Sequence, residues 1–154
     1  MTSYLDADSQ VELTITPTDG DYKSLPRKVP NLPKIENGTR PGVELHGVSF
    51  TPIASPSLGS SEMSMWRAHV LPGEGVLHHM TREEIILAVG GAGVIRIGGE
   101  VHQLTPGDAF AVPAFTDFRL ECANADHFEA VVALPVGGRA VIGNQPSFAP
   151  PWSI

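Results

Sequence analysis

Two adjacent histidines and two adjacent glutamates lie close together in the segment GVLHHMTREEIILAVGG, residues 75–91. The histidines are His78 and His79, and the glutamates are Glu83 and Glu84. Imidazole nitrogens and carboxylate oxygens bind divalent metal ions, and the same groups transfer protons in general acid–base catalysis. The segment therefore indicates either a metal centre or a metal-free site that moves protons.

The elements that must position these residues are short. The chain has 154 residues, of which 16 are glycine and 14 are proline, and so many breakers leave few windows long enough for a helix. Turn sequences such as Gly98-Gly99 separate stretches that read as strands. The pattern predicts an all-β fold, an antiparallel sandwich or barrel. The strand-like stretches are residues 43–50, 62–71, 83–89, 93–99, 109–113, 117–122 and 128–134.

The N-terminal part differs from the rest. VELTITP, residues 11–17, alternates apolar and polar side chains and could form one strand. Three prolines between residues 26 and 33 then prevent a helix or a central strand. We expect residues 1–42 to be an extended proline-rich arm that lies across the barrel or across a partner subunit, and residues 43–154 to form the barrel. A partly disordered leader is the alternative.

The tail PSFAPPWSI, at the other end of the chain, contains two large aromatic residues. We expect Phe148 and Trp152 to pack over one end of the barrel.

Composition narrows the partners and the location. The formal net charge is −7 and no stretch concentrates lysine and arginine, so no nucleic-acid partner is expected. No run of about 18 apolar residues occurs, so no membrane span is expected either. Cys122 is the only cysteine, and the N-terminus has neither the basic region nor the apolar core of a signal peptide. We therefore expect a cytoplasmic protein.

The order of turns and strands resembles the cupins, a superfamily of small double-stranded β-helix (jelly-roll) barrels. The first cupin motif runs G, five residues, H-x-H, three or four residues, E, six residues, G. The second runs G, five residues, P-x-G, two residues, H, three residues, N. The matching segments are LPGEGVLHHMTREEIILAVGG (71–91), IGGEVHQLTPGD (97–108) and AFAVPAFTDF (109–118). The resemblance covers roughly residues 60–135 and implies a jelly-roll barrel.

The metal ligands that the resemblance implies are only partly present in the first motif. Counting back from the last glycine of the motif places Glu84 at the position of the ligand glutamate. A gap of three residues puts Met80 and His78 at the two histidine positions, and a gap of four puts His79 and Leu77 there. Neither register gives H-x-H.

The second motif departs further from the family pattern. Gly107 and Pro113 fit it, but Phe115 stands where glycine is usual, and Phe118 stands where the fourth ligand histidine should be. An apolar ring thus replaces a metal donor.

Pleat geometry limits what the adjacent histidines can do. Successive side chains of a strand point to opposite faces, so only one of His78 and His79 can share the lumen with Glu84 unless a bulge intervenes. We expect His78 inside beside Met80 and His79 outside, with the opposite register as the alternative. Catalytic zinc and iron sites ordinarily use three protein ligands, so no cofactor is expected. If a metal is bound, it is a divalent ion such as Fe, Zn, Mn or Ni, held by His78 or His79 together with Glu84.

A site without a metal can still carry out chemistry. A histidine and a glutamate in an apolar lumen could act as base and acid, and burial would raise the pKa of the Glu84 carboxyl. Arg67 could bind a substrate carboxylate or enolate oxygen if its strand face is the lumen; an exposed face is the alternative. The catalytic candidates are therefore His78, Glu84 and Arg67. The apolar candidates for substrate binding are Trp66, Met80, Ile86, Phe110 and Phe118.

Three functions fit these residues. The first is a metal-independent cupin enzyme that cyclises, isomerises or dehydrates a hydrophobic substrate, similar to cyclases and isomerases of polyketide-type secondary metabolism. The second is a metal-dependent dioxygenase or lyase that uses His78 or His79 with Glu84. The third is a module that binds a small ligand without catalysis. In each case we expect a homodimer, because small jelly-roll domains bury their open edges against another copy.

Overall fold

The computed structural model describes residues 34–36 and 40–154. The predicted strand at 11–17 and nearly all of the proline-rich arm lie outside the described residues.

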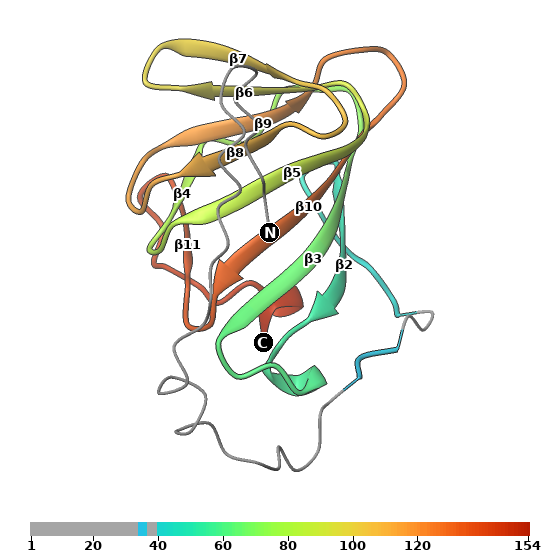
Figure 1. The fold of residues 1–154 in the computed structure, drawn as a ribbon. Coiled ribbons are helices and arrows are strands. Elements are labelled where there is room, and N and C mark those ends of the chain that lie inside the picture. Colours follow the sequence, from blue (N-terminus) through green and yellow to red (C-terminus); the bar gives the residue numbers. More distant parts are fainter. Residues whose placement is uncertain (1–33, 37–39) are drawn as a thin grey trace, which may run out of the picture. The chain divides into compact units, whose positions relative to one another are not determined.

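Two antiparallel sheets make up the described part of the chain (Figure 1). The first has the strand order β1-β2-β3-β10-β5-β8 and the second the order β11-β4-β9-β6-β7. The first sheet comprises β1 (Val43–Leu45), β2 (Val48–Ala54), β3 (Met63–Val70), β10 (Phe128–Pro135), β5 (Glu84–Gly91) and β8 (Ala109–Val112). The second comprises β11 (Ala140–Ile142), β4 (His78–Met80), β9 (Phe118–Cys122), β6 (Gly93–Ile97) and β7 (Glu100–Leu104). The all-β jelly-roll prediction is confirmed.

Helical structure in the described residues is limited to two short 3-10 turns, η1 (Pro56–Leu58) and η2 (Pro151–Ser153). Neither 3-10 turn is long and apolar enough to cross a lipid bilayer, and the described residues contain no other helix.

The core lies between the two sheets and is built by strict alternation along the strands. In β10 every second residue, beginning with Phe128, is buried, and β5 alternates in the same way from Glu84. Burying a large apolar side chain stabilises the fold by about 1.5–3 kcal/mol, so these inward rows account for much of the stability. The largest fully buried apolar side chains are Phe118, Phe128, Ile86, Ile95 and Leu134.

The stretch 43–50 is not one strand, contrary to the sequence-based expectation. The chain reverses at His46 and Gly47, whose φ angles are 51° and 78°, and Leu45 pairs with Val48 across the turn. Two successive residues with positive φ form the tight turn that suits the twist of a hairpin. The apolar–polar alternation continues through this turn, which explains why the pattern looked like a single strand.

The predicted strand-like stretches do not include three of the observed strands, β4, β7 and β11, although extended chain was assumed at His78-His79 and on both sides of Gly98-Gly99. β4 and β11 have only three residues each, too few for a periodic pattern. β7 contains His102, whose ring lies 5.0 Å from the ring of Phe110 and whose Nε2 approaches Glu100 at 3.1 Å.

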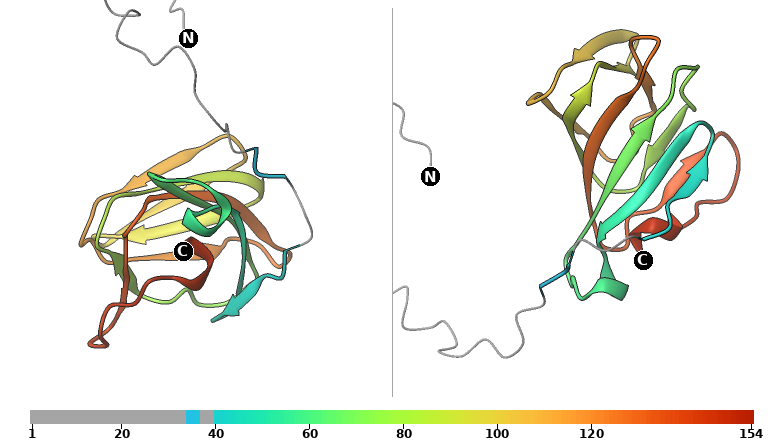
Figure 2. Two further views of the ribbon diagram at one scale, coloured as in Figure 1. Left: turned by 90° about the horizontal axis from the view of Figure 1, so that it is seen from below. Right: turned by 90° about the vertical axis from the view of Figure 1, so that its right-hand side faces the viewer.

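The C-terminal tail packs inside one end of the ring of strands, as predicted. Trp152 is stacked on Phe50 with ring centroids 3.8 Å apart, and Phe148 packs against the core. The buried Ser64 hydroxyl donates a hydrogen bond of 2.6 Å to the Ser153 carbonyl, which fixes the tail to β3. Figure 2 (left) shows the tail in dark red within the ring.

Candidate active site

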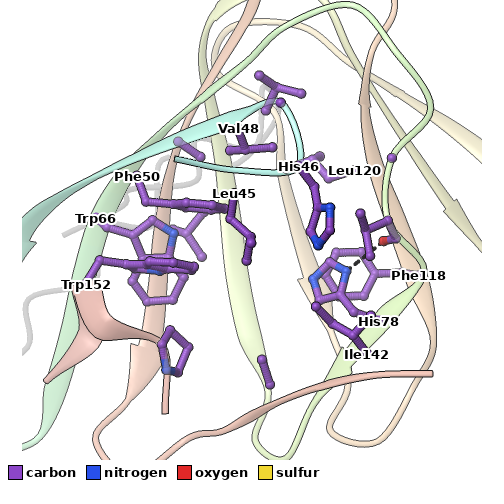
Figure 3. Close-up of a pocket in the computed structure, with 18 of the residues that line it drawn as sticks. Leu45, His46, Val48, Phe50, Trp66, His78, Phe118, Leu120, Ile142 and Trp152 are labelled. Atoms are coloured by element: carbon purple, nitrogen blue, oxygen red, sulfur yellow. Dashed lines mark hydrogen bonds between the residues drawn. The ribbon is translucent and has the colours of Figure 1, made fainter. Parts of the chain in front are cut away.

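A cavity of about 190 Å³ lies between the two sheets, lined by residues of both and by the C-terminal tail (Figure 3). Most of the lining side chains are apolar. The ionisable side chains among them are His46, Glu74, His78 and Glu84.

The mouth of the cavity is formed by the β1–β2 turn and by residues 71–76, the loop between β3 and β4. The Leu71 amide donates a 3.1 Å hydrogen bond to the Gly47 carbonyl and joins the turn to the loop. Arg119 pairs with Glu74 and donates to the Gly75 carbonyl at 3.0 Å. The loop is thus held from two sides, and the mouth has a defined shape.

Aromatic side chains form one side of the cavity. Trp152 stacks on Phe50 and meets Trp66 edge to face, with ring centroids 6.3 Å apart. The Trp152 Nε1 is buried and has no hydrogen-bond partner among the described residues. This side of the cavity therefore offers mainly aromatic surface.

His78 lies on the opposite side, where β4 places it in the cavity. Its Nδ1 lies 2.9 Å from the Val76 carbonyl oxygen, which can only accept, so in the neutral ring Nδ1 carries the proton and Nε2 is the basic nitrogen. Burial lowers the pKa of His78 and the neighbouring His79 adds to this, while the Val76 hydrogen bond and Asp117 oppose it. At neutral pH His78 is therefore a neutral base.

Glu84 is only 5% exposed and lines the same cavity. Its carboxyl makes no hydrogen bond and no ion pair with any other described residue. Burial raises the pKa of Glu84 to about 8, in the direction expected from the sequence. At neutral pH the group is a carboxylic acid that can donate a proton into an apolar space.

His79 points away from the cavity. Its Nδ1 lies 2.8 Å from Asp117 Oδ1, and the side chain does not line the cavity. The alternation His78-in, His79-out, Met80-in is therefore the register that the structure has. The alternative with His79 inside is wrong.

The expectation that Arg67 binds substrate is also wrong. On β3 the residues that line the cavity are Trp66 and Ala68, so Arg67 must lie on the outer face. Its side chain is 53% exposed and approaches Glu129 of β10 at 3.4 Å. It reaches no cavity group.

The predicted apolar substrate-binding residues divide into two groups. Trp66, Met80 and Phe118 line the cavity. Ile86 is fully buried in the core and Phe110 packs against its edge, but neither lines the cavity, which corrects their assignment. The two residues are paired neighbours on β5 and β8 of the first sheet.

His46 is the cavity residue that sequence reasoning missed. It projects from the turn at the mouth, and Figure 3 shows its ring directed toward His78. Its left-handed conformation, φ 51°, is uncommon for any residue except glycine, although histidine tolerates it better than most. The dipeptide His-Gly where Asn-Gly is usual in such a turn is a signal that could have identified the residue.

The donors present do not fit a metal ion. No group of three His, Cys, Asp or Glu side chains in residues 34–36 and 40–154 is arranged to hold one. At the positions that the cupin pattern assigns to ligands, Met80 and Phe118 line the cavity instead. The Phe118 ring lies 4.3 Å from the His78 ring and fills space that a third donor would need.

Comparison with known proteins agrees with this architecture. Residues 66–134 match the model of the family described as "Cupin domain". Salicylate 1,2-dioxygenase from Pseudoaminobacter salicylatoxidans superposes with a TM-score of 0.57 at 19% identity, over 69% of this chain and 31% of that one. This chain therefore spans about a third of the dioxygenase.

Two smaller proteins are similar over more of their own length. KdgF from Halomonas sp. has a TM-score of 0.53 at 21% identity, with 62% of this chain and 86% of that one covered. A putative sugar phosphate isomerase from Acidithiobacillus ferrooxidans has a TM-score of 0.52 at 15% identity, with 62% and 66% covered. No curated protein sequence matches the chain. At these identities the solved structures establish the fold alone, and the family match over residues 66–134 agrees with a cupin fold.

Proposed function

We propose that this protein is a cupin enzyme that catalyses acid–base chemistry on a hydrophobic small molecule without a metal ion. Cyclisation, isomerisation and dehydration of a polyketide-like substrate are the reactions that suit it. One observation carries the proposal: an imidazole and a buried carboxyl, His78 and Glu84, line a single, mostly apolar cavity.

The proposed reactions share a first step, the removal of a proton from a carbon next to a carbonyl. His78 Nε2 takes that proton, and the electron pair of the C–H bond becomes the new carbon–carbon double bond. The carbonyl oxygen, which gains the charge, accepts the proton of Glu84, and an enol forms. Return of a proton to another carbon completes an isomerisation, whereas attack of the enol on a second carbonyl completes a ring closure. Paired acid and base groups of this kind accelerate such steps by about 10²–10⁴-fold.

Deuterium exchange tests this step without knowledge of the true substrate. Benzylacetone, a neutral apolar ketone, is incubated with the enzyme in D₂O, and deuterium next to the carbonyl is followed by NMR. We expect the wild type to accelerate exchange, and H78A and E84Q each to lose about 10²-fold or more of that acceleration. E83Q removes the adjacent, exposed carboxylate and is the matched control that should exchange like wild type. Equal exchange by wild type, H78A and E84Q would refute the proposal.

The same assay separates the other two functions. A metal-dependent enzyme loses its exchange activity after treatment with a chelator and recovers it with a divalent ion, whereas the proposed enzyme is unaffected. A module that only binds its ligand shows saturable binding of the ketone and no enzyme-dependent exchange.

We propose further that the chain works as a homodimer and, because its one cysteine is unpaired, in a reducing compartment such as the cytoplasm. The outer face of the first sheet supports the dimer. Leu87 of β5 is 38% exposed and stands beside Val131 of β10, between the similarly exposed Ile85 and Val89. A row of aliphatic side chains on an open sheet face is typical of a subunit contact. L87E should convert a dimer to a monomer in light scattering, and a monomeric wild type would refute the proposal.

A further inference from the structure

On the basis of the proposed function, we infer that the cavity selects uncharged substrates and discriminates against anions. The ligand that it fits is an apolar molecule with an aromatic or other flat hydrocarbon end and a single carbonyl or hydroxyl group.

The charge of the lining is the first reason. None of the described residues that line the cavity is lysine or arginine. Arg119 lies near the mouth, but it is paired with Glu74 and donates to the Gly75 carbonyl, and it does not line the cavity. A carboxylate or phosphate entering this space would lose its hydration without gaining a cationic partner, which is costly.

The carboxyl groups are the second reason. Glu74 and Glu84 both line the cavity, one at the mouth and one inside, and the chain as a whole carries a net charge of −7. Glu74 is paired with Arg119 and Glu84 is uncharged at neutral pH, so neither offers positive charge, and an approaching anion meets a chain of net negative charge and finds no compensation within the cavity.

The division of the cavity into two sides is the third reason. Figure 3 shows Phe50, Trp66 and Trp152 gathered on one side and the rings of His46 and His78 on the other. An aromatic wall binds hydrocarbon through its area, and the polar side can satisfy one oxygen through a hydrogen bond. A ligand that spans both sides is therefore amphipathic and neutral.

The protein carries its own reporter for this inference. Its two tryptophans, Trp66 and Trp152, both line the cavity, so the tryptophan fluorescence comes entirely from the site. Three probes share one phenylethyl group and differ in charge: benzylacetone is neutral, hydrocinnamate is an anion of nearly the same shape, and phenylpropylammonium is a cation. Each is titrated at neutral pH with the tryptophans excited at the red edge of their absorption.

We expect benzylacetone to bind about 100-fold more tightly than hydrocinnamate, because the anion is desolvated without a partner. Equal or tighter binding of hydrocinnamate would overturn the inference, and so would equal or tighter binding of phenylpropylammonium. Failure of all three probes to bind would overturn it as well, since an accessible apolar cavity must accept a phenylethyl group.

A matched pair of variants tests the cause. Leu120→Lys places a cation in the cavity lining, whereas Leu77→Lys adds the same charge at a position that is 47% exposed and outside the cavity. We expect L120K to reduce the ratio of the benzylacetone affinity to the hydrocinnamate affinity at least tenfold, and L77K to leave this ratio unchanged. Ile142→Lys, from another lining strand, repeats the test if L120K does not fold. Unchanged selectivity in folded L120K and I142K would show that the missing cation is not the cause.

These experiments can refute the charge selectivity and the proposed catalysis independently of each other. Loss of deuterium exchange with a retained preference for the ketone refutes the proposed chemistry alone. Retained exchange with a preference for the carboxylate refutes the charge selectivity alone.

Discussion

Glu84→Gln should stabilise the protein at alkaline pH, and the size of the effect follows from burial of the carboxyl. Glutamine keeps the size and the hydrogen-bonding character of protonated glutamate but cannot ionise. The pKa of Glu84 is raised from 4.5 to about 8 in the folded state, so the two pKa values lie about 3.5 pH units apart. At about 1.4 kcal/mol for each unit, the carboxyl costs the wild type about 4–5 kcal/mol of stability above pH 8.

The direction of the pH dependence follows from proton binding. Between pH 4.5 and about 8 the folded chain keeps the Glu84 proton that the unfolded chain has released. The free energy of unfolding contributed by this group therefore falls as the pH rises through that window and is constant above it. The advantage of E84Q over wild type should be near zero at about pH 4 and should grow to its full value above about pH 8.

Urea denaturation at a series of pH values, followed by tryptophan fluorescence, measures this difference. Contributions of the other titrating groups cancel when the two proteins are compared at the same pH. Glu83→Gln removes the neighbouring exposed carboxylate and is the control, with an expected change within about 0.5 kcal/mol. If wild type and E84Q differ by the same amount at every pH, Glu84 is not buried as a neutral acid and the proposed proton donor is wrong.

Two further predictions concern the cavity wall and the core. Phe118→His places a third donor beside His78 in the cavity that Glu84 also lines, so it should retain close to one equivalent of zinc after desalting, measured by elemental analysis. Wild type that retains as much zinc would contradict the view that Phe118 excludes a metal. Gly93→Ala should destabilise the fold by about 1–3 kcal/mol in urea denaturation, because the added Cβ would lie 2.6 Å from carbons of the buried Phe128 ring. A loss below about 0.5 kcal/mol would mean that this ring can move aside.

The longer strands were predictable from sequence because one physical rule produces them. Alternating burial in β3, β5 and β10 appears directly in the residue order, and tight turns such as Gly98-Gly99 need residues that accept positive φ. The same alternation gave the orientation of His78 relative to His79. A short strand such as β11 was not predictable, since three residues carry no period and tertiary pairing alone keeps them extended.

The site was less predictable than the fold. Alternation shows that Trp66 and Arg67 face opposite ways, but it does not show which of them faces inward, and both had been assigned to the substrate. His46 lies in a turn, where no periodicity applies, and its place at the mouth depends on contacts between distant segments such as the Leu71–Gly47 hydrogen bond. Whether Ile86 lines a void or packs in the core depends on side-chain volumes that no pattern records.

The second sheet is continuous at one end and nearly divided at the other. β6 and β9 pair along their whole length, whereas β4 meets β9 only where His78 faces Phe118. Few hydrogen bonds therefore join β4 and β11 to the rest of the second sheet, and we expect the amide hydrogens of these two strands to exchange with solvent sooner than those of β10. Because β4 carries the proposed base His78, substitutions in β4 and β11 could change the position or the pKa of that base while the longer strands keep the fold stable.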